Sequence, residues 1–193
     1  MKKLPRAFYA RPDVVAVARE LLGKVLVTRF DGIITSGVIT ETEAYMGAGD
    51  RASHAYGGKV TPRNKVMYGE SGVAYVYLCY GIHHLFNVVT NAPGIAHAVL
   101  VRAIHPLKGK DMMLQRRKST KLTTGGPGTL TQALGILTEH SGTDLLGDLI
   151  TIEDHKIIVP DNEVIIGPRI GVDYAGEDAY LPYRFHFHPH ILE

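Results

Sequence analysis

Two β-branched segments joined by Asp31-Gly32 constrain the fold of this chain more than any other feature. The segments span residues 24–30 and 33–40 and are rich in valine, isoleucine and threonine, which suit paired strands. An Asp-Gly pair between two such segments is the strongest short signal for a tight β-hairpin. The sequence therefore predicts an antiparallel strand pair near the N-terminus.

Further short apolar segments extend this pair into a sheet. We expect them at residues 74–79, 84–90, 96–104, 149–153, 156–159, 164–166 and 184–187. Helices are expected over 14–22, where Asp13 can cap the first turn, and over 108–118 and 129–134. The pattern predicts an α+β fold with a curved, mostly antiparallel sheet or open barrel-like core, short flanking helices and a protruding β-hairpin. With 193 residues, the chain suits a single domain over 1–193.

Composition and missing motifs exclude several classes of function. The single cysteine, Cys79, cannot form an internal disulfide, and no apolar stretch is long enough to span a bilayer, so we expect a cytoplasmic protein, associated with the nucleoid if bacterial. The sequence has no phosphate-binding P-loop, no dinucleotide-binding glycine motif and no GxSxG nucleophile turn. Hydrolysis by a carboxylate therefore remains as the available chemistry.

Candidate catalytic residues cluster in the string ETEAY. Alternation along a strand places Glu41, Glu43 and Tyr45 on one face. A carboxylate that is partly desolvated beside an aromatic ring is suited to act as a general base. Two solvent-facing glutamates are the alternative, and the spacing alone favours that alternative.

Aromatic and basic residues are unevenly distributed. Tyr75, Tyr77 and Tyr80 lie in one predicted hairpin, and Tyr80 before Gly81 would project from its tip, which suits stacking on a partner; Tyr75 is equally well explained as core. One basic segment runs from 102 to 121 and contains Asp111 as its only acidic residue. It suits a phosphate-facing surface or, equally, a solvated helix face.

A histidine triplet near the C-terminus is a minor metal candidate. His186, His188 and His190 alternate along a predicted strand, as zinc ligands can. Pro189 breaks that regularity, and no cysteine pair or HExxH string supports the metal site. We therefore expect no metal and no nucleotide cofactor.

Several strings together resemble the alkyladenine (methylpurine) DNA glycosylase family. The resemblance covers nearly the whole chain, and ETEAY and TPRN are its most specific parts. The strings are ARPDVVAVARELLGKVLV, ITETEAYMG, the segment 54–64, VYLCYGIHHLFNVV, VLVRAIHPL, GPGTLTQALGI and PRIGVDYAGEDAYLPYRF. The hairpin string Gly81-Ile82-His83-His84 departs from relatives that often carry Met and Tyr there, so we expect different minor-groove contacts and damage preference.

The resemblance implies a role for particular residues. Glu43 would activate the attacking water, which Arg102 and the backbone carbonyl of Ile170 would help to hold, while Glu41 supports the structure. The walls that sandwich the extruded base would be Tyr45, His54 and Tyr77. Asn87 would crowd the exocyclic amine of normal guanine, and Tyr80, with Ile82 beside it, would fill the gap left in the duplex. Contacts to the DNA backbone are expected from Thr61 and Arg63, with Lys108, Lys110, Arg116 and Arg117 added from the basic segment.

The expected function is that of a monofunctional base excision repair glycosylase. It would flip alkylated or deaminated purines (3-methyladenine, 7-methylguanine, hypoxanthine, ethenoadenine) out of double-stranded DNA and hydrolyse the glycosidic bond, without lyase activity. We expect it to act as a monomer. Two alternatives stay open at this point: a nucleic-acid-binding protein without catalysis, and a metal-dependent hydrolase built on the histidine triplet.

Overall fold

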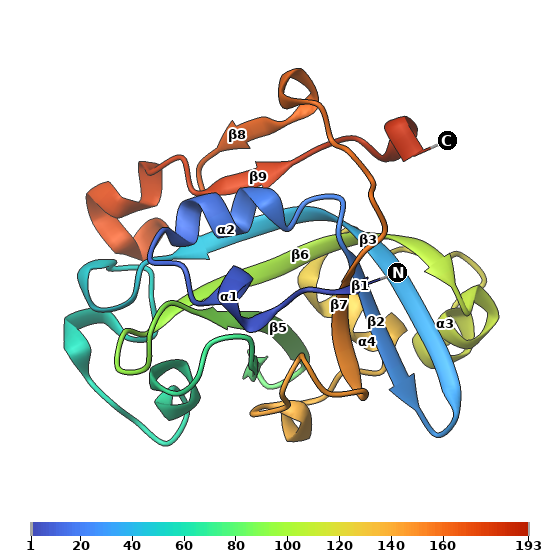
Figure 1. The fold of residues 1–193 in the computed structure, drawn as a ribbon, viewed down its shortest axis with the longest axis horizontal. Coiled ribbons are helices and arrows are strands. Elements are labelled where there is room, and N and C mark those ends of the chain that lie inside the picture. The colour runs from blue at the N-terminus through green and yellow to red at the C-terminus, as the bar shows by residue number, and fades with distance from the viewer. Residues whose placement is uncertain (1, 193) are drawn as a thin grey trace.

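An antiparallel sheet forms the framework of the molecule, and its order explains which segments meet. The computed structural model describes residues 2–192, and all strand pairs in that range are antiparallel (Figure 1). The strands are β1 (Lys2–Lys3), β2 (Val25–Phe30), β3 (Ile33–Tyr45), β4 (Ala74–Cys79), β5 (His83–Thr90), β6 (His97–Lys108), β7 (Ile150–Asp154), β8 (Ile165–Gly167) and β9 (Arg184–His186). Their order is β1-β7-β2-β3-β6-β5-β4, and β9 joins β3 to β8.

The predicted hairpin is confirmed, and β3 extends beyond it. Asp31 and Gly32 form its turn with φ of 53° and 75°, and the register pairs Phe30 with Ile33. The strand then continues five residues past the predicted end at 40, because its second half pairs with β9 on one side and β6 on the other. This shared half carries the ETEAY string into the middle of the sheet.

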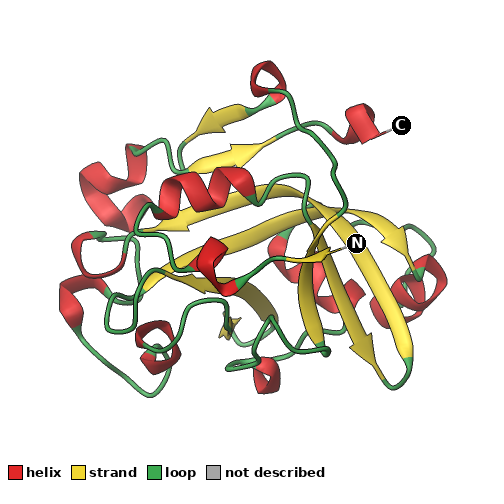
Figure 2. Cartoon of the chain, in the orientation of Figure 1, coloured by secondary structure: helices red, strands yellow, loops and turns green. Residues whose placement is uncertain are grey.

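Short helices cover the sheet at both ends, as Figure 2 shows. They are α1 (Arg6–Tyr9), α2 (Val14–Glu20), α3 (Lys110–Arg117) and α4 (Pro127–Leu134). The predicted cap of α2 is present, since the Asp13 carboxylate accepts a hydrogen bond of 2.9 Å from the Ala16 amide. Short 3-10 turns lie at Gly47–Gly49, Tyr56–Gly58, Lys65–Tyr68, Thr138–His140, Asp161–Glu163, Asp173–Tyr180 and Pro189–Leu192. The observed α+β architecture agrees with the predicted fold class.

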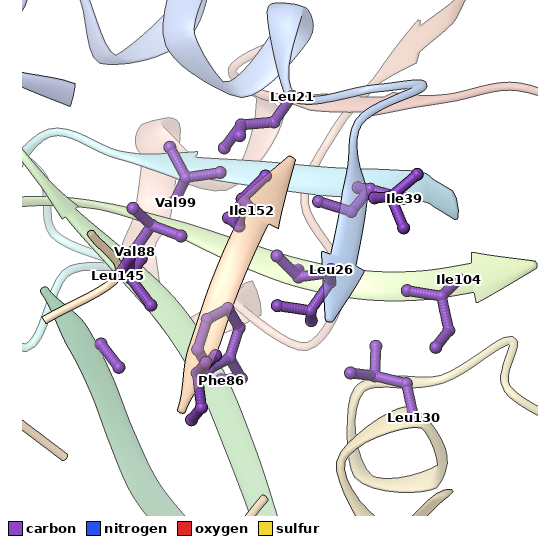
Figure 3. Close-up of a cluster of buried hydrophobic side chains, with 14 of the residues drawn as sticks. Leu21, Leu26, Ile39, Phe86, Val88, Val99, Ile104, Leu130, Leu145 and Ile152 are labelled. Carbon is purple, nitrogen blue, oxygen red and sulfur yellow. The ribbon is translucent and has the colours of Figure 1, made fainter. Parts of the chain in front are cut away.

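The main core lies between the sheet and the helices (Figure 3). Leu21 after α2 packs toward the strands from one side, and Leu130 of α4 packs from another. Strand residues such as Leu26 and Ile39 are fully buried between them. This packing fixes the ends of β3 and β6, and those two strands carry the candidate site.

One predicted strand is wrong. Residues 156–159 lie outside the sheet, and Ile158 is 84% exposed. The Asp154 carboxylate accepts a hydrogen bond from the Lys156 amide, and Lys156 adopts a left-handed φ of 61°, so the chain turns away from β7. Ile157 and Val159 still pack, partly buried, against the main core, so the segment makes apolar contacts without forming a strand. In the part of the chain that the structure describes, no helix is long and apolar enough to cross a membrane.

Candidate active site

A cavity of about 420 Å³ opens where β3, β4, β5 and β6 meet two loops. The loops contain residues 51–67 and 168–174, which are far apart in sequence and lie together at this end of the sheet (Figure 1). Its size suits a small organic ligand. The lining residues are Tyr45, Ala52, Ser53, His54, Arg63, Met67, Tyr75, Tyr77, Leu78, Cys79, Tyr80, Leu85, Asn87, Ala98, Leu100, Arg102, Ile170, Gly171, Val172 and Tyr174.

Glu43 lies directly behind the cavity wall. Its side chain is fully buried, and its carboxylate accepts hydrogen bonds from the Tyr45 hydroxyl at 2.7 Å and the Ile170 amide at 2.8 Å. Burial raises the pKa of Glu43, and this effect outweighs the opposing effects of Arg102, the Ile170 amide and Tyr45. A carboxylate offers about four acceptor positions. Glu43 therefore retains capacity for another hydrogen-bond donor, such as water.

Arg102 is turned toward both glutamates by an irregularity in the sheet. The register pairs Glu41 with Ala103 and Thr42 with Val101, so Arg102 is an extra residue on β6, as in a β-bulge. Its Nε lies 3.2 Å from the Glu41 carboxylate, and its Nη1 lies 3.4 Å from that of Glu43. Arg184 also contacts Glu41, at 3.0 Å. Glu41 therefore orients Arg102 between the two acids, which explains how both glutamates can be shielded from solvent.

Tyr45 is held from behind by a buried ion pair. The guanidinium of Arg169 lies 4.8 Å from the centre of the Tyr45 ring and forms an ion pair with Asp50, and both charged side chains are almost completely buried. Arg169 also donates to the Ala44 carbonyl at 3.0 Å. Since Ile170 follows Arg169, one buried arginine fixes both hydrogen-bond donors that contact Glu43.

His54 and Tyr77 form a second aromatic surface in the cavity. Their ring centres are 4.6 Å apart at an angle of 72°. The His54 backbone is fixed by Asn64, whose amide nitrogen donates to the carbonyls of His54 at 2.8 Å and Lys59 at 2.9 Å. Tyr45, His54 and Tyr77 thus line the same cavity, and their role as walls for an extruded base stays a prediction.

Asn87 lies on the floor of the same cavity. Its side chain is 3% exposed, and its amide nitrogen donates to the carbonyls of Tyr75 at 3.1 Å and Leu85 at 3.3 Å. Asn87 on β5 and Glu43 on β3 both pair with Leu100 on β6, so a single strand lies between them. The amide is therefore oriented by the sheet itself.

The β4–β5 hairpin exposes two apolar side chains beside the cavity mouth. Tyr80 is 91% exposed and Ile82 is 71% exposed. Tyr80 also has a left-handed φ of 50°, which is strained for a bulky residue. The predicted projection of Tyr80 is confirmed. An exposed ring in a strained turn is typical of a residue kept for contact with a partner.

Comparison with known proteins gives this arrangement a family. Residues 7–190 match the family described as methylpurine-DNA glycosylase. The chain belongs to this family. Its members are DNA glycosylases, enzymes of DNA repair, and the resemblance found in the sequence is confirmed.

Relatives of this methylpurine-DNA glycosylase match it along nearly the whole length. A protein of Chlamydia felis is 49% identical over 186 residues, 94% of each chain. One from Chlamydia pneumoniae is 46% identical, covering 96% of this chain and 95% of its own. One from Bacillus thuringiensis is 44% identical, covering 96% of each chain. All three bear the name "Putative 3-methyladenine DNA glycosylase".

The residues predicted to contact the DNA backbone fall into two groups in this glycosylase. Thr61 is bonded to the Asn64 side chain, and Arg63 lines the cavity with its guanidinium 4.9 Å from the Tyr77 ring. Lys108 and Lys110 are exposed near the start of α3, at the opposite end of β6 from the cavity loops (Figure 1). These four remain predictions.

Arg116 and Arg117 are partly buried and have partners within the protein, and their contact with DNA also stays a prediction. Arg116 donates to the Thr35 hydroxyl at 3.2 Å and the Ala133 carbonyl at 3.3 Å. Arg117 donates to the Thr123 hydroxyl at 2.9 Å and the Gln132 side chain at 3.1 Å. Both guanidinium groups therefore join α3 to its neighbours, which the count of basic residues could not reveal.

The histidine triplet does not form a compact metal site. Ring centres are 6.0 Å apart for His186 and His188 and 6.2 Å apart for His188 and His190. Within residues 2–192, no group of three or more His, Cys, Asp or Glu side chains is placed to hold a metal ion. The strand β9 ends at His186, so the alternation assumed from sequence stops there.

Sequence reasoning missed the residues that orient the site. Asp50, Asn64, Arg169 and Arg184 do not stand out by composition. Asp50, Arg169 and Arg184 act through contacts with distant segments, and Asn64 acts through the carbonyls of His54 and Lys59 earlier in its own loop. Asn64 lies in the string TPRN and Arg169 in PRIG, but neither string shows which residue the side chain contacts. Only the fold shows that these residues hold the loops around the cavity.

Proposed function

We propose that this protein excises damaged purines from double-stranded DNA and leaves an abasic site. The observation that carries the proposal is a buried carboxylate, Glu43, directly behind a cavity lined by Tyr45, His54 and Tyr77. The substrates that fit this cavity are purines rotated out of the DNA base stack, such as 3-methyladenine, 7-methylguanine, hypoxanthine and ethenoadenine. Enzymes that act on a base must first extrude it, and aromatic walls compensate for the lost stacking.

Glu43 serves as the general base in this proposal. A raised pKa makes the carboxylate a better proton acceptor, while the Tyr45 hydroxyl, the Ile170 amide and Arg102 keep it ionised and oriented. As the glycosidic bond breaks, positive charge develops on the sugar, and the carboxylate stabilises that charge. Water held by Glu43 gives its proton to the carboxylate as its oxygen bonds to the sugar carbon and the glycosidic C–N bond breaks. A cationic alkylated purine leaves as a neutral base, whereas hypoxanthine and ethenoadenine take up a proton from solvent water. Arg102 and the Ile170 carbonyl would complete the contacts to this water.

Recognition of the base comes from the aromatic walls and from Asn87. Purines alkylated on ring nitrogens carry positive charge, and attraction to tyrosine faces contributes about 0.5–2 kcal/mol. Extrusion costs a few kcal/mol and less for damaged pairs, which adds selectivity. The fixed Asn87 side chain limits the space for an extra exocyclic amine. Tyr80 and Ile82, both exposed at the hairpin, would occupy the space left in the duplex.

Direct attack by water leaves the DNA strand intact. A lyase needs an amine nucleophile that forms a covalent adduct with the sugar. Among the described residues that line the cavity there is no lysine. The product is therefore an abasic site in an unbroken strand, and borohydride would trap no protein–DNA adduct.

The test compares the wild type with Glu43→Gln on duplexes that each carry one damaged purine. Alkali converts abasic sites to strand breaks, and fluorescence anisotropy reports binding. Loss of a general base lowers the single-turnover rate by about 10²–10⁴-fold. Binding should persist, because Gln has the same shape.

A matched control is Glu153→Gln, which changes a mostly buried glutamate paired with Arg29 far from the cavity in sequence and in the sheet. It should keep the wild-type rate. If the wild type binds the damaged duplexes but releases no base, the protein is a binding module and the proposal fails.

A further inference from the structure

Tyr75 is buried below the aromatic cavity, yet one of its atoms reaches the cavity wall. The residue is 2% exposed and packs in a small apolar cluster with Met67, Val89 and Ala98. Its hydroxyl oxygen lies 2.8 Å from Nδ1 of His54. Packing alone would be satisfied by phenylalanine, so the hydroxyl calls for a separate explanation.

The imidazole of His54 is held in one orientation. Its backbone is bonded to Asn64, its ring contacts Tyr77 at 4.6 Å, and Nδ1 is occupied by Tyr75. Within the described chain, Nε2 has no hydrogen-bond partner. Nε2 is therefore the nitrogen available to a ligand in the cavity.

At neutral pH the His54 imidazole carries one N–H proton, and the hydrogen bond with Tyr75 determines which nitrogen holds it. Desolvation and the charge of Arg63 lower the pKa of His54, so the imidazole is neutral. Burial raises the pKa of Tyr75 to about 12, so its hydroxyl keeps its proton. A phenol hydroxyl is a stronger donor than a neutral imidazole N–H, and an imidazole nitrogen is a stronger acceptor than a phenol oxygen. The Tyr75 O–H therefore points toward Nδ1 of His54, 2.8 Å away, and the imidazole proton lies on Nε2.

We propose that Tyr75 is a positioning residue that fixes the tautomer of His54, so that Nε2–H is offered as a hydrogen-bond donor to the base in the cavity. The proposal rests on the proposed function for its ligand and assigns Tyr75 to base recognition. It selects bases that present an acceptor, such as a ring nitrogen or a carbonyl oxygen, to Nε2. A free His54 would exchange between two tautomers and lose part of this selection.

The first test is nitrogen NMR on the protein without DNA, labelled with ¹⁵N-histidine. The His54 signals are assigned from their loss in His54→Gln. In the wild type we expect Nε2 to be the protonated, pyrrole-type nitrogen and Nδ1 the acceptor. In Tyr75→Phe we expect a mixture of tautomers. Tyr9→Phe is the matched control, because Tyr9 is also buried and its hydroxyl has no partner among the described residues.

The second test measures single-turnover base release from a duplex with one hypoxanthine. Loss of one oriented hydrogen bond should lower the rate about tenfold in Tyr75→Phe and leave Tyr9→Phe unchanged. A protonated Nδ1 in the wild type, an unchanged tautomer in Tyr75→Phe, or an unchanged rate would overturn the proposal. If the wild type released no base while NMR gave the expected tautomers, the proposed function would fail and the Tyr75–His54 pair would stand.

Discussion

At the scale of single residues, the buried environment of Glu43 suits a general base but lowers the stability of the fold. Three partners orient its carboxylate, yet the net effect of burial still raises its pKa above the value in an unfolded chain. A group whose pKa is raised on folding binds its proton more tightly in the native state. The ionised form therefore destabilises the fold at neutral pH, and this cost disappears as the pH falls through the folded pKa.

This linkage predicts that Glu43→Gln stabilises the protein. Gln removes the cost of a buried charge, so the variant should have a higher Tm than the wild type at pH 7.5, and the difference should shrink below the raised pKa. Differential scanning calorimetry at several pH values measures both effects. A variant that melts lower than the wild type at pH 7.5 would mean that the contacts to Tyr45, Ile170 and Arg102 outweigh burial.

Tyr80 is a second residue whose conformation lowers the stability of the fold. Its left-handed φ of 50° costs about 1–2 kcal/mol for a non-glycine residue, and Asn tolerates this conformation better. Tyr80→Asn should therefore raise the free energy of unfolding by about 1 kcal/mol while slowing base release, because the exposed ring is lost. Urea unfolding and single-turnover rates test the two halves separately. Equal rates in both proteins would remove Tyr80 from the proposed DNA contact.

Individual residues also show where sequence reasoning reaches its limit. The exposure of Tyr80 follows from the glycine beside it, a local signal that can be recognised without a structure. The position of Glu43 behind the cavity does not follow, since the spacing of Glu41 and Glu43 alone favours solvent. The buried ion pair of Arg169 with Asp50 joins residues more than a hundred positions apart. No local pattern reports such a pair.

At the scale of elements, strand irregularity determines the site. Regular pairing between β3 and β6 would leave no extra residue, and Arg102 gains its orientation from the shift in register beside Glu41. The existence of both strands was predictable from their apolar segments. Their extensions to Tyr45 and Lys108, and the bulge between them, depend on β9 and on packing from other segments.

The β4–β5 hairpin is buttressed by α4, which makes its position testable. A Cβ on Gly128 would lie 2.8 Å from the His83 ring and 3.0 Å from the His83 Cβ, next to the turn of the hairpin. Thr131 of α4 also donates to the His84 carbonyl at 2.6 Å. Gly128→Ala should displace the hairpin and lower the base-release rate several-fold, with less than about 1 kcal/mol change in the free energy of unfolding, since Ala favours the helix.

Gly125→Ala provides the control for this experiment, because a Cβ there meets nothing within 4 Å. Rates are measured by single-turnover release and stability by urea unfolding. If both alanine variants release base at the wild-type rate, the hairpin is not positioned by α4.

At the scale of the whole molecule, the structure divides the basic segment into two parts. The guanidinium groups of Arg116 and Arg117 bind α4 and its surroundings, whereas Lys108 and Lys110 are exposed. A net charge of +2 is too small for the overall charge of the protein to account for attraction to DNA phosphates. Attraction to phosphate must therefore depend on where free lysines lie relative to the cavity.

Salt dependence of binding locates this surface. Each phosphate contact contributes about −0.9 to the slope of log K against log salt, so Lys108→Gln with Lys110→Gln should reduce the slope by up to about 1.8 if both contact the backbone. Lys2→Gln with Lys156→Gln is the control for loss of charge, since both lysines are exposed near the edge of the sheet formed by β1. Equal slopes for the two double variants would show that bound DNA does not extend from the cavity along β6 to α3. The phosphate contacts would then have to come from the cavity loops, where Arg63 is already placed at the wall.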